Sequence, residues 1–312
     1  ISTKNQGFGG QVSTNLKYAE YDHEFNLFLD GDGLTGNVPL SQLAYLLARG
    51  EQESAAHHFT VNGMPLDADV LVFGNRVLDR QRPAIDWSFE SAYTRNFSVG
   101  EHEHAATIGV FYSSARAYDI NLITGYLTTF DDRPSLVHAV SGDVVIADHG
   151  LVQTNGYTKH HKNKVKRTAL YLVDQMEWGD WIFDVGARHE TYEVNTYRRG
   201  IEGLNVISDP HLHELLSVVG YPSDAQATHA RVEDDAFAVA MGIVYKYNDM
   251  TSFYANLSDG YFFPQPRTVQ LDSNNQPNSL EEERLLLSEL GIKYRGDNLR
   301  LTLAALFTRL KD

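Results

Sequence analysis

Apolar and polar residues alternate along several stretches of the chain, and this alternation restricts the possible folds more than any other feature. Over residues 85–99 the odd positions carry mainly aromatic and aliphatic side chains, whereas the even positions carry mainly polar ones. The same period recurs over residues 181–193, 251–263, 289–295 and 299–309. Because successive side chains of a β-strand point to opposite faces, each stretch predicts a strand with one apolar and one polar face.

The predicted strands come in pairs around very short connectors rich in Gly, Asn and Asp. These residues favour tight hairpin turns because they tolerate positive φ angles. Five hairpins, and so about ten strands, are predicted in this way. The five connectors are Tyr21-Asp22-His23, the Gly100-Glu101 region, Gly179-Asp180, Asn248-Asp249-Met250 and Gly296-Asp297-Asn298.

Long connectors separate the hairpins, over residues 30–84, 119–166, 194–235 and 264–288. Short and long connections therefore alternate, which places the tight turns at one end of the sheet and the long loops at the other. Outer-membrane β-barrels have this asymmetry, with short periplasmic turns and longer extracellular loops. Strands of about 9–11 residues also match a tilted crossing of the hydrocarbon layer. A short helix is predicted within the first long loop, over residues 39–49.

Composition excludes several other classes of protein. The formal charge of −15 argues against a nucleic-acid binder, which needs clustered Lys and Arg. No segment offers the ~20 apolar residues of a membrane helix. The chain has no Cys, which rules out disulfides and cysteine-based metal or nucleophile sites. An all-β antiparallel barrel segment fits best, and a soluble sheet with one buried face is the alternative.

The barrel interpretation assigns a direction to each strand face. Trp181, Phe183, Val185 and Ala187 would face lipid, and the aromatic residues near the short turns, Trp178, Trp181, Tyr245 and Tyr247, would form an interfacial girdle. The opposite face would meet an aqueous interior, where charges act as structural pairs or line a ligand path. The residues predicted to face this lumen are Asp184, Arg188, Glu190, Tyr254, Asn256, Glu289 and Lys293.

Three groups of motifs follow one another in the second half of the chain. They are ALYLVDQ at 169–175 with GARHE at 186–190, GIVY at 242–245 with TSFYANLSDGY at 251–261, and LEEE at 280–283 with ELGIKY at 289–294 and ALF at 305–307. In order and spacing these motifs resemble TonB-dependent outer-membrane receptors of Gram-negative bacteria. The resemblance is clear over residues 167–312, less distinct over 85–166, and rests mainly on the strand pattern over 1–84.

The resemblance implies a 22-strand barrel that is filled by an N-terminal plug, whose first residues form the TonB-binding box. On this basis residues 1–312 would be a partial barrel domain of about ten strands. The chain opens on Ile1 and ends straight after an alternating run. We therefore expect it to be an interior piece of a longer polypeptide, without the plug domain, the TonB box or the closing C-terminal strand.

The function implied by the resemblance is active transport across the bacterial outer membrane by a multi-pass β-barrel. The ligand would be scarce: a siderophore, cobalamin, haem or an oligosaccharide. Energy would come from the TonB–ExbB–ExbD complex through the missing plug, and outer-membrane lipid and lipopolysaccharide would be further partners. A passive porin-type barrel and a soluble β-rich carbohydrate-binding protein are the alternatives. The residues expected to contact the ligand from the long loops are Tyr157, Tyr197, Arg198, Arg199 and Tyr221.

No catalytic residue, cofactor or metal site is predicted, so the chain is not expected to be an enzyme. His189-Glu190 and His213-Glu214 each lack the second His, one helical turn away, of a zinc protease. Gly7-Phe8-Gly9-Gly10 lacks the strand–helix setting of a nucleotide-binding loop and is interpreted as a loosened strand end. The pairs His160-His161 and His211/His213 are the ones that could meet at the outer mouth.

Overall fold

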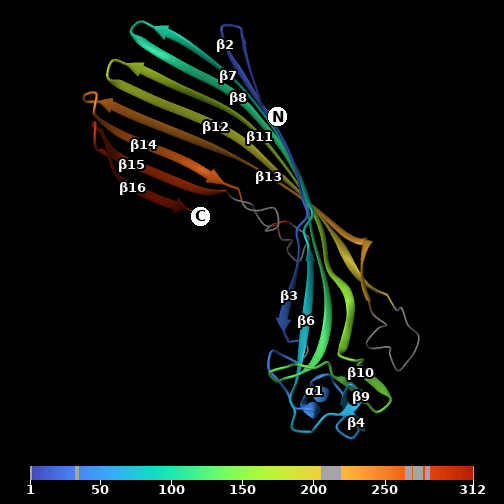
Figure 1. Ribbon diagram of the computed structural model, residues 1–312. Coiled ribbons are helices and arrows are strands. Elements are labelled where there is room, and N and C mark those ends of the chain that lie inside the picture. The colour runs from blue at the N-terminus through green and yellow to red at the C-terminus, as the bar shows by residue number, and fades with distance from the viewer. Residues whose placement is uncertain are drawn as a thin grey trace.

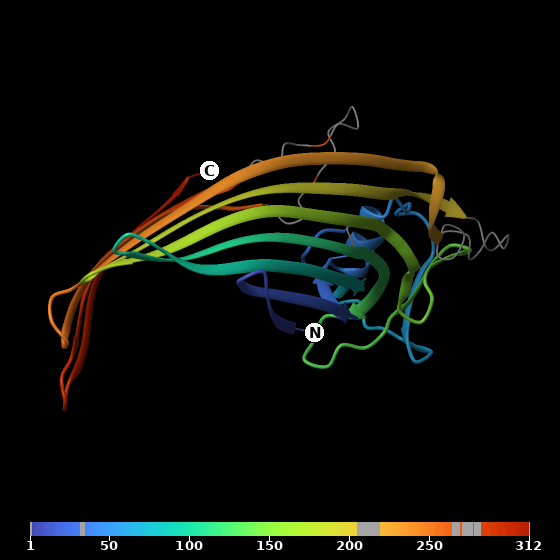
Figure 2. The ribbon, with the colours of Figure 1, turned by 90° about the horizontal axis from the view of Figure 1, so that it is seen from above.

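The computed structural model of the chain is dominated by one large antiparallel sheet with strongly elongated strands (Figures 1 and 2). A small sheet and one helix lie at one end of these strands (Figure 1). None of the helices formed by the described residues is long and apolar enough to span a membrane. The structure describes residues 2–31, 35–204, 219–263, 269, 277 and 282–311.

Ten strands of the large sheet follow a single path, β1-β2-β7-β8-β11-β12-β13-β14-β15-β16, in which all neighbours are antiparallel. The strands are β1 (Ser2–Gly7), β2 (Gly10–Tyr21), β7 (Ala84–Val99), β8 (His102–Thr129), β11 (Leu151–Trp178), β12 (Trp181–Leu204), β13 (Val219–Lys246), β14 (Thr251–Phe262), β15 (Glu283–Arg295) and β16 (Arg300–Lys311). The predicted barrel segment of about ten antiparallel strands is confirmed. The described strands do not close into a ring, because β1 and β16 are the two edges of the path.

The short turns gather at one end of the sheet, as predicted (Figure 1). Gly100 and Gly179 adopt positive φ angles of 62° and 56° in the β7–β8 and β11–β12 turns. A β-hairpin turn of two residues requires such angles, which glycine adopts without steric cost. The hairpins around residues 248–250 and 296–298 are also present.

The predicted hairpin around Tyr21-Asp22-His23 is wrong. β2 pairs with β7, and the next strand, β3 (Glu24–Asp30), pairs instead with β6 (Val72–Gln81). β3 therefore continues β2 outward, and β6 leads directly into β7. Pro83 lies opposite the break between β2 and β3. Because proline cannot donate a ladder hydrogen bond, the chain is also interrupted between β6 and β7 at this level.

The first hairpin turn lies instead at Phe8-Gly9, between β1 and β2. Both turn residues have positive φ angles, 52° for Phe8 and 75° for Gly9. The interpretation of Gly7-Phe8-Gly9-Gly10 as a loosened strand end was therefore wrong. Phe at the first turn position concealed the hairpin, since that position usually carries Asn, Asp or Gly.

Much of the predicted long loops is strand. β8, β11 and β13 each contain 28 residues, and β12 contains 24. At about 3.3 Å per residue, 28 residues extend roughly 90 Å, far more than the hydrocarbon layer requires. The outer part of these strands is polar on both faces, as in Lys159–Lys164, and so lacks the alternation by which the inner part was recognised.

The outer end of the sheet carries a compact cap, which consists of a helix and four short strands (Figure 1). Ser41 begins the helix by accepting a hydrogen bond from the Ala44 N–H at 3.2 Å, and the predicted loop helix is confirmed. Tyr45 and Leu46 of the helix are fully buried in the core of the cap. The elements of the cap are α1 (Gln42–Ala48), β4 (His57–Val61), β5 (Met64–Pro65), β9 (His138–Ser141) and β10 (Val144–Ala147).

The register of the sheet separates an apolar face from a polar face. Trp181, Tyr245, Phe253, Ile292 and Leu303 stand directly opposite one another across β12 to β16 and so share one face. No second sheet of described residues covers this row, and Leu303 remains 57% exposed. The row is therefore not the core of a sandwich. We call the side that carries it the apolar face and the opposite side the polar face.

Candidate functional site

A buried carboxylate organises the middle of the polar face. Glu190 on β12 is only 1% exposed and accepts hydrogen bonds from Arg188, at 2.9 and 2.6 Å, and from Arg167. The Tyr261 hydroxyl donates to the same carboxylate at 3.0 Å. Two guanidinium groups and one hydroxyl therefore compensate the buried charge, and they tie β11, β12 and β14 together.

The seven residues predicted to face the lumen lie on the polar face, as the register shows. Asp184 accepts a hydrogen bond from Gln175 at 2.9 Å, and Glu289 accepts one from Tyr254 at 2.7 Å. The Lys293 ammonium lies 4.8 Å from the centre of the Tyr254 ring. These contacts are cross-strand pairs, which agrees with a structural role for most of the set. Their exposure to a lumen stays a prediction.

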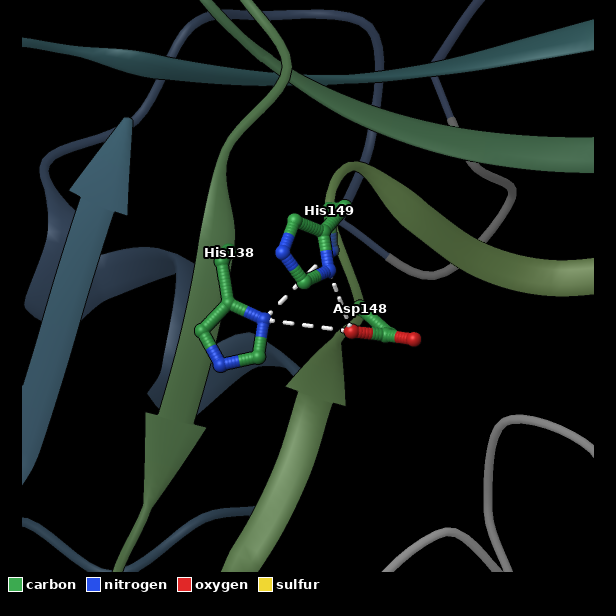
Figure 3. Close-up of side chains that lie close together, drawn as sticks. All are labelled: His138, Asp148 and His149. Atoms are coloured by element: carbon green, nitrogen blue, oxygen red, sulfur yellow. Dashed lines mark hydrogen bonds and ion pairs between the residues drawn. The ribbon is translucent and has the colours of Figure 1, made fainter. Parts of the chain in front are cut away.

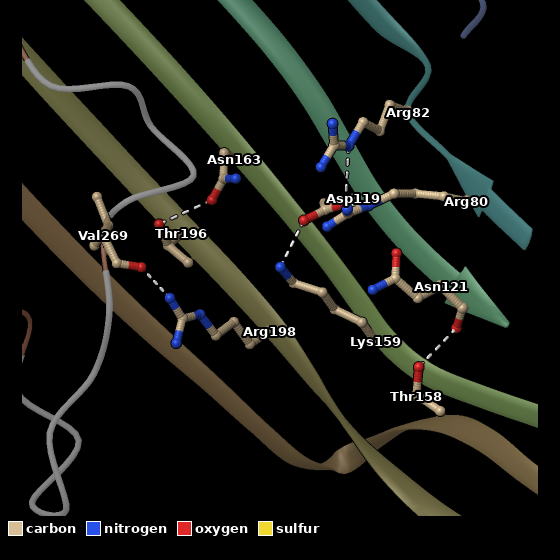
Figure 4. Close-up of polar contacts among 10 residues, drawn as sticks. All are labelled: Arg80, Arg82, Asp119, Asn121, Thr158, Lys159, Asn163, Thr196, Arg198 and Val269. Carbon is tan, nitrogen blue, oxygen red and sulfur yellow. Dashed lines mark hydrogen bonds and ion pairs between the residues drawn. The ribbon is translucent and has the colours of Figure 1, made fainter. Parts of the chain in front are cut away.

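Farther out on the polar face, one buried acid is surrounded by three basic side chains (Figure 4). Asp119 of β8 has an 8% exposed side chain, and Lys159 of β11 donates to its Oδ2 at 2.5 Å. Arg80 and Arg82 donate to Oδ1 at 3.4 and 3.2 Å. Register brings these residues together: Asn121 of β8 pairs with both Arg80 and Lys159.

Arg198 of β12 extends this group toward the neighbouring strands. Asp119, His161 and Arg198 are directly opposite one another across β8, β11 and β12, so they share the polar face. The Arg198 guanidinium donates through Nη2 to the carbonyl oxygen of Val269 (Figure 4). We call Arg80, Arg82, Lys159 and Arg198, together with Asp119, the cationic cluster.

The charges of the cationic cluster do not cancel. Four basic side chains face one acid, so the cluster carries a formal charge of 4 − 1 = +3, in a chain whose net charge is −15. Hydrogen bonds and charge from Lys159, Arg82 and Arg80 lower the pKa of Asp119 to about 2 against the opposing effect of burial. Burial, with the nearby charges of Lys159 and Arg198, lowers the pKa of His161 to about 4. The cluster is thus an electropositive region that favours an anion.

Two buried polar atoms of this region have no partner among the described residues: Nε of Arg198 and Oδ1 of Asn121. Buried polar atoms are normally hydrogen-bonded, since an unpaired one costs about 1–3 kcal/mol. A donor and an acceptor are therefore available beside the cationic cluster. This combination suits a small polar ligand with a negative charge.

The structure does not bring the five predicted ligand residues together. Arg198 belongs to the cationic cluster, whereas Tyr197, the adjacent residue of a regular strand segment, lies on the opposite face. Tyr197 and Arg199 both donate to Asp224. Tyr221 donates to Glu202 at 2.8 Å, and the Tyr157 ring lies 6.0 Å from that of His160. A ligand role for these five residues stays a prediction.

Sequence reasoning missed Arg80, Arg82, Asp119 and Lys159. They lie in segments that the pattern assigned to long loops, and their contacts span 37 to 40 residues of sequence. One signal in the sequence could have indicated two of them. Arg80 and Arg82 come just before Pro83, and this proline marks the outer end of a strand. Of the two histidine pairs that could have met at the outer mouth, His160 and His161 point to opposite faces as strand neighbours, and His211 and His213 lie outside the described residues.

The residue types on the apolar face also change along the strands, from the short turns toward the cap. Near the turns its rows are apolar, for example Ile108, Leu172, Ala187 and Val239 across four neighbouring strands. Farther out, the rows become polar and mixed in charge, and two of them are rich in Lys and Arg. We call the four basic residues of two successive rows the outer basic patch: Arg116, Lys162, Lys164 and Arg231. All of them except Arg116 line a shallow hollow of about 590 Å³.

Aromatic residues mark the turn end of the apolar face. Trp181 and Tyr245 stack with ring centres 4.5 Å apart, and Tyr247 meets Phe253 edge-on at 6.3 Å. Trp178 ends β11 and is 48% exposed. The predicted clustering of these four aromatic residues beside the short turns is thus present in the structure.

Comparison with known proteins gives one family and several solved structures. The family model for the TonB dependent receptor-like β-barrel matches residues 2–312. No curated protein matches the chain. The siderophore receptor PiuA from Acinetobacter baumannii is 12% identical, with a TM-score of 0.45 over 97% of this chain and 50% of that one.

Two further solved structures are similar at the same level. The ferric-catecholate import receptor Fiu from Escherichia coli K12, in its closed form, is 13% identical with a TM-score of 0.39, over 97% of this chain and 49% of that one. The ferric yersiniabactin uptake receptor FyuA from Yersinia pestis is 12% identical with a TM-score of 0.37, over 97% and 45%. The chain thus spans about half the length of the solved structures that it matches.

Proposed function

The chain belongs to the TonB-dependent receptor β-barrel family, and we propose that it forms about half of the barrel of a receptor that imports an anionic small molecule. The family consists of outer-membrane transporters rather than enzymes. The observation that carries the choice of ligand is the cationic cluster, which places a charge of +3 on the polar face. Of the ligand classes left open by the sequence, a ferric siderophore with carboxylate or catecholate groups, or haem with its carboxylates, suits this charge best.

Placement in the outer membrane is supported by the succession of side chains on the apolar face. An aromatic group beside the turns is followed by apolar rows, then by polar rows of mixed charge, and then by the outer basic patch. Outer-membrane barrels show an apolar band about 25 Å tall between aromatic girdles. We therefore propose that the apolar face meets lipid, that the polar face lines the lumen, and that the cap is extracellular.

The ligand proposal predicts that removing positive charge from the cationic cluster weakens ligand binding. In the complete receptor, Arg198→Gln and Lys159→Met should each weaken binding of a ferric tricatecholate at least tenfold, since a hydrogen bond to a charged group contributes about 1.5–3 kcal/mol. Fluorescence titration of the purified receptor measures the affinity. Lys293→Met is the matched control, because Lys293 is on the polar face near the short turns. A receptor that prefers a neutral ferric trihydroxamate, with no response to either variant, would contradict the proposal.

Energy coupling is the second part of the proposal. We infer that the complete receptor is driven by the TonB–ExbB–ExbD complex, through a plug and TonB box that we expect outside these residues. Collapsing the proton gradient with an uncoupler should then stop uptake of the ligand while leaving its binding to cells unchanged. Uptake that continues in uncoupled cells would instead favour the passive porin-type alternative.

A third part concerns the lipid around the barrel. Lys164 lies 14 residues before Trp178, roughly 46 Å along a strand and 33–38 Å in height at a tilt of 35–45°. With the apolar face against lipid, as proposed, this height would correspond to the level of the lipid headgroups, just beyond the apolar band. Within the described part of the chain, Arg116, Lys162 and Lys164 form no ion pair. We propose that this patch binds the phosphate groups of lipopolysaccharide.

The lipid proposal predicts a measurable loss of lipopolysaccharide binding. Replacing Arg116, Lys162 and Lys164 together by Gln should weaken it about 100-fold, since each basic residue near an anionic surface contributes about 1 kcal/mol. The amount of lipopolysaccharide that co-purifies with the receptor checks this. Lys246→Gln with Arg295→Gln, at the other end of the barrel wall, is the control. If both variants retain the same amount of lipopolysaccharide, the proposal that the outer basic patch binds it is contradicted.

A further inference from the structure

Three potential metal ligands meet at the edge of the cap, where no motif predicted a site (Figure 3). They are one ring nitrogen each of His138 and His149 and one carboxylate oxygen of Asp148, and the three atoms lie within 4.8 Å of one another. The Asp148 oxygen is 2.7 Å from Nδ1 of His149 and 3.4 Å from Nδ1 of His138. The two imidazole rings lie 5.1 Å apart.

The protein core holds His138 in this position. His138 begins β9, and its neighbours Val137 and Ala139 are completely buried in the core of the cap. Because side chains alternate along a strand, burial of these two neighbours directs His138 outward. The backbone N–H of His149 donates to Nδ1 of His138 at 3.4 Å. Nδ1 is the acceptor in this long contact, so its lone pair faces the His149 N–H, and a metal bound at Nδ1 would replace that hydrogen bond.

A tight turn fixes the other two ligands. Asp148 and Leu151 exchange backbone hydrogen bonds of 2.8 and 3.0 Å around His149-Gly150. Both central residues have positive φ angles, 49° for His149 and 91° for Gly150. Asn or Gly is favoured at the first of these positions, so a His there departs from the usual turn chemistry. Gly150 also donates to the Val137 carbonyl at 3.0 Å, which attaches the turn to the strand that carries His138.

We propose that His138, Asp148 and His149 bind a divalent transition-metal ion at the extracellular cap. Two imidazole nitrogens and one carboxylate oxygen form a donor set that Zn²⁺ and similar cations accept. Zinc–ligand distances of about 2.0–2.2 Å place ligand atoms roughly 3.3 Å apart in a tetrahedron, and the three candidate atoms here lie within 4.8 Å of one another. Three protein ligands leave a coordination position for water or for a donor atom of another molecule.

Exposure of the ligands fits a site that is open to the outside. The His149 side chain is 83% exposed, and those of Asp148 and His138 are 43% and 29% exposed. The metal site is separate from the cationic cluster, whose residues lie on or beside β6, β8, β11 and β12 rather than on the elements of the cap. It depends neither on the nature of the imported ligand nor on TonB coupling.

The proposal is tested by metal titration of the complete receptor in detergent micelles. ZnCl₂ titration by calorimetry should show a site of micromolar or tighter affinity, and CoCl₂ should produce the visible absorption bands of a low-symmetry Co²⁺ site. His138→Ala, Asp148→Asn and His149→Gly should each weaken Zn²⁺ binding at least tenfold. His149→Gly preserves the turn, because Gly is favoured at its position.

His58→Ala is the matched control, because His58 is an exposed His on β4 of the same small sheet but outside the group of three. It should bind Zn²⁺ with unchanged affinity. Heat-modifiable migration of each variant on a gel shows that the barrel has formed. Absence of micromolar Zn²⁺ binding by the wild-type receptor would overturn the proposal. Binding by folded His138→Ala and His149→Gly at wild-type affinity would do so as well.

Discussion

Replacing Glu190 by Ala should destabilise the barrel by about 3–5 kcal/mol, the range observed when one partner of a buried ion pair is removed. Glu190 is almost fully buried and accepts hydrogen bonds from Arg167, Arg188 and Tyr261. Without the carboxylate, two guanidinium groups remain close together with no compensating charge. Their mutual repulsion adds to the cost of their incomplete hydration.

Glu190→Gln should be less harmful than Glu190→Ala, because the amide oxygen still accepts a hydrogen bond. Glu177→Ala serves as the control, since Glu177 is 50% exposed and its contact with Lys246 is 4.0 Å long. An exposed pair of this kind contributes about 0–1 kcal/mol. Urea unfolding of the complete receptor in micelles, followed by tryptophan fluorescence, gives the free energies. If Glu190→Ala and Glu177→Ala lower the free energy of unfolding equally, the buried carboxylate stabilises the barrel no more than an exposed one, which would contradict the prediction.

Gly109→Ala should lower the free energy of unfolding by about 3 kcal/mol. A Cβ at Gly109 would lie 2.2 Å from the ring of Tyr171, its direct cross-strand partner. The ring would have to move, although its hydroxyl donates to Glu90 at 2.9 Å. Overpacking typically costs 1–3 kcal/mol, and loss of a hydrogen bond to a charged group adds about 1.5–3 kcal/mol. The same arrangement recurs where Tyr254 crosses Gly291.

Gly186→Ala is the control for this prediction. Gly186 is also a strand glycine on the polar face, but a Cβ there would meet Val173 at 3.5 Å, an ordinary contact. Its substitution should change the free energy of unfolding by no more than about 0.5 kcal/mol. The same urea measurement compares the two variants. If both alanine variants unfold alike, crowding by Tyr171 is not the reason for the glycine at position 109.

Local features of the barrel wall could be predicted from the sequence. The alternation over residues 181–193 assigned Asp184 and Arg188 to one face and Trp181 to the other, as the register shows. The turn at Gly179-Asp180 was predicted because turn chemistry is written into adjacent residues. Phe8-Gly9 was missed because the first turn residue breaks the usual preference. The prediction of a hairpin at Tyr21-Asp22-His23 was wrong because residues typical of turns also occur where a strand is only interrupted.

The cationic cluster and the metal site could be predicted much less well from local sequence. Arg198 was the only member of the cationic cluster among the predicted ligand residues. Its other members were in segments assigned to loops, where both strand faces meet water and no alternation remains. The metal ligands His138 and Asp148 are ten residues apart in the sequence and meet only because β9 and the turn before β11 pack on the same cap core.

Sequence alone determined the period-two strands, the two chemical faces and the end at which the short turns gather. These properties depend on neighbouring residues, whose side chains alternate and whose turns require particular φ angles. Only the tertiary structure decided how far the strands extend and which side chains meet across them. Asp119 contacts Arg80 and Lys159 through a register set by pairing along the whole length of β6, β8 and β11, which no single stretch of sequence contains.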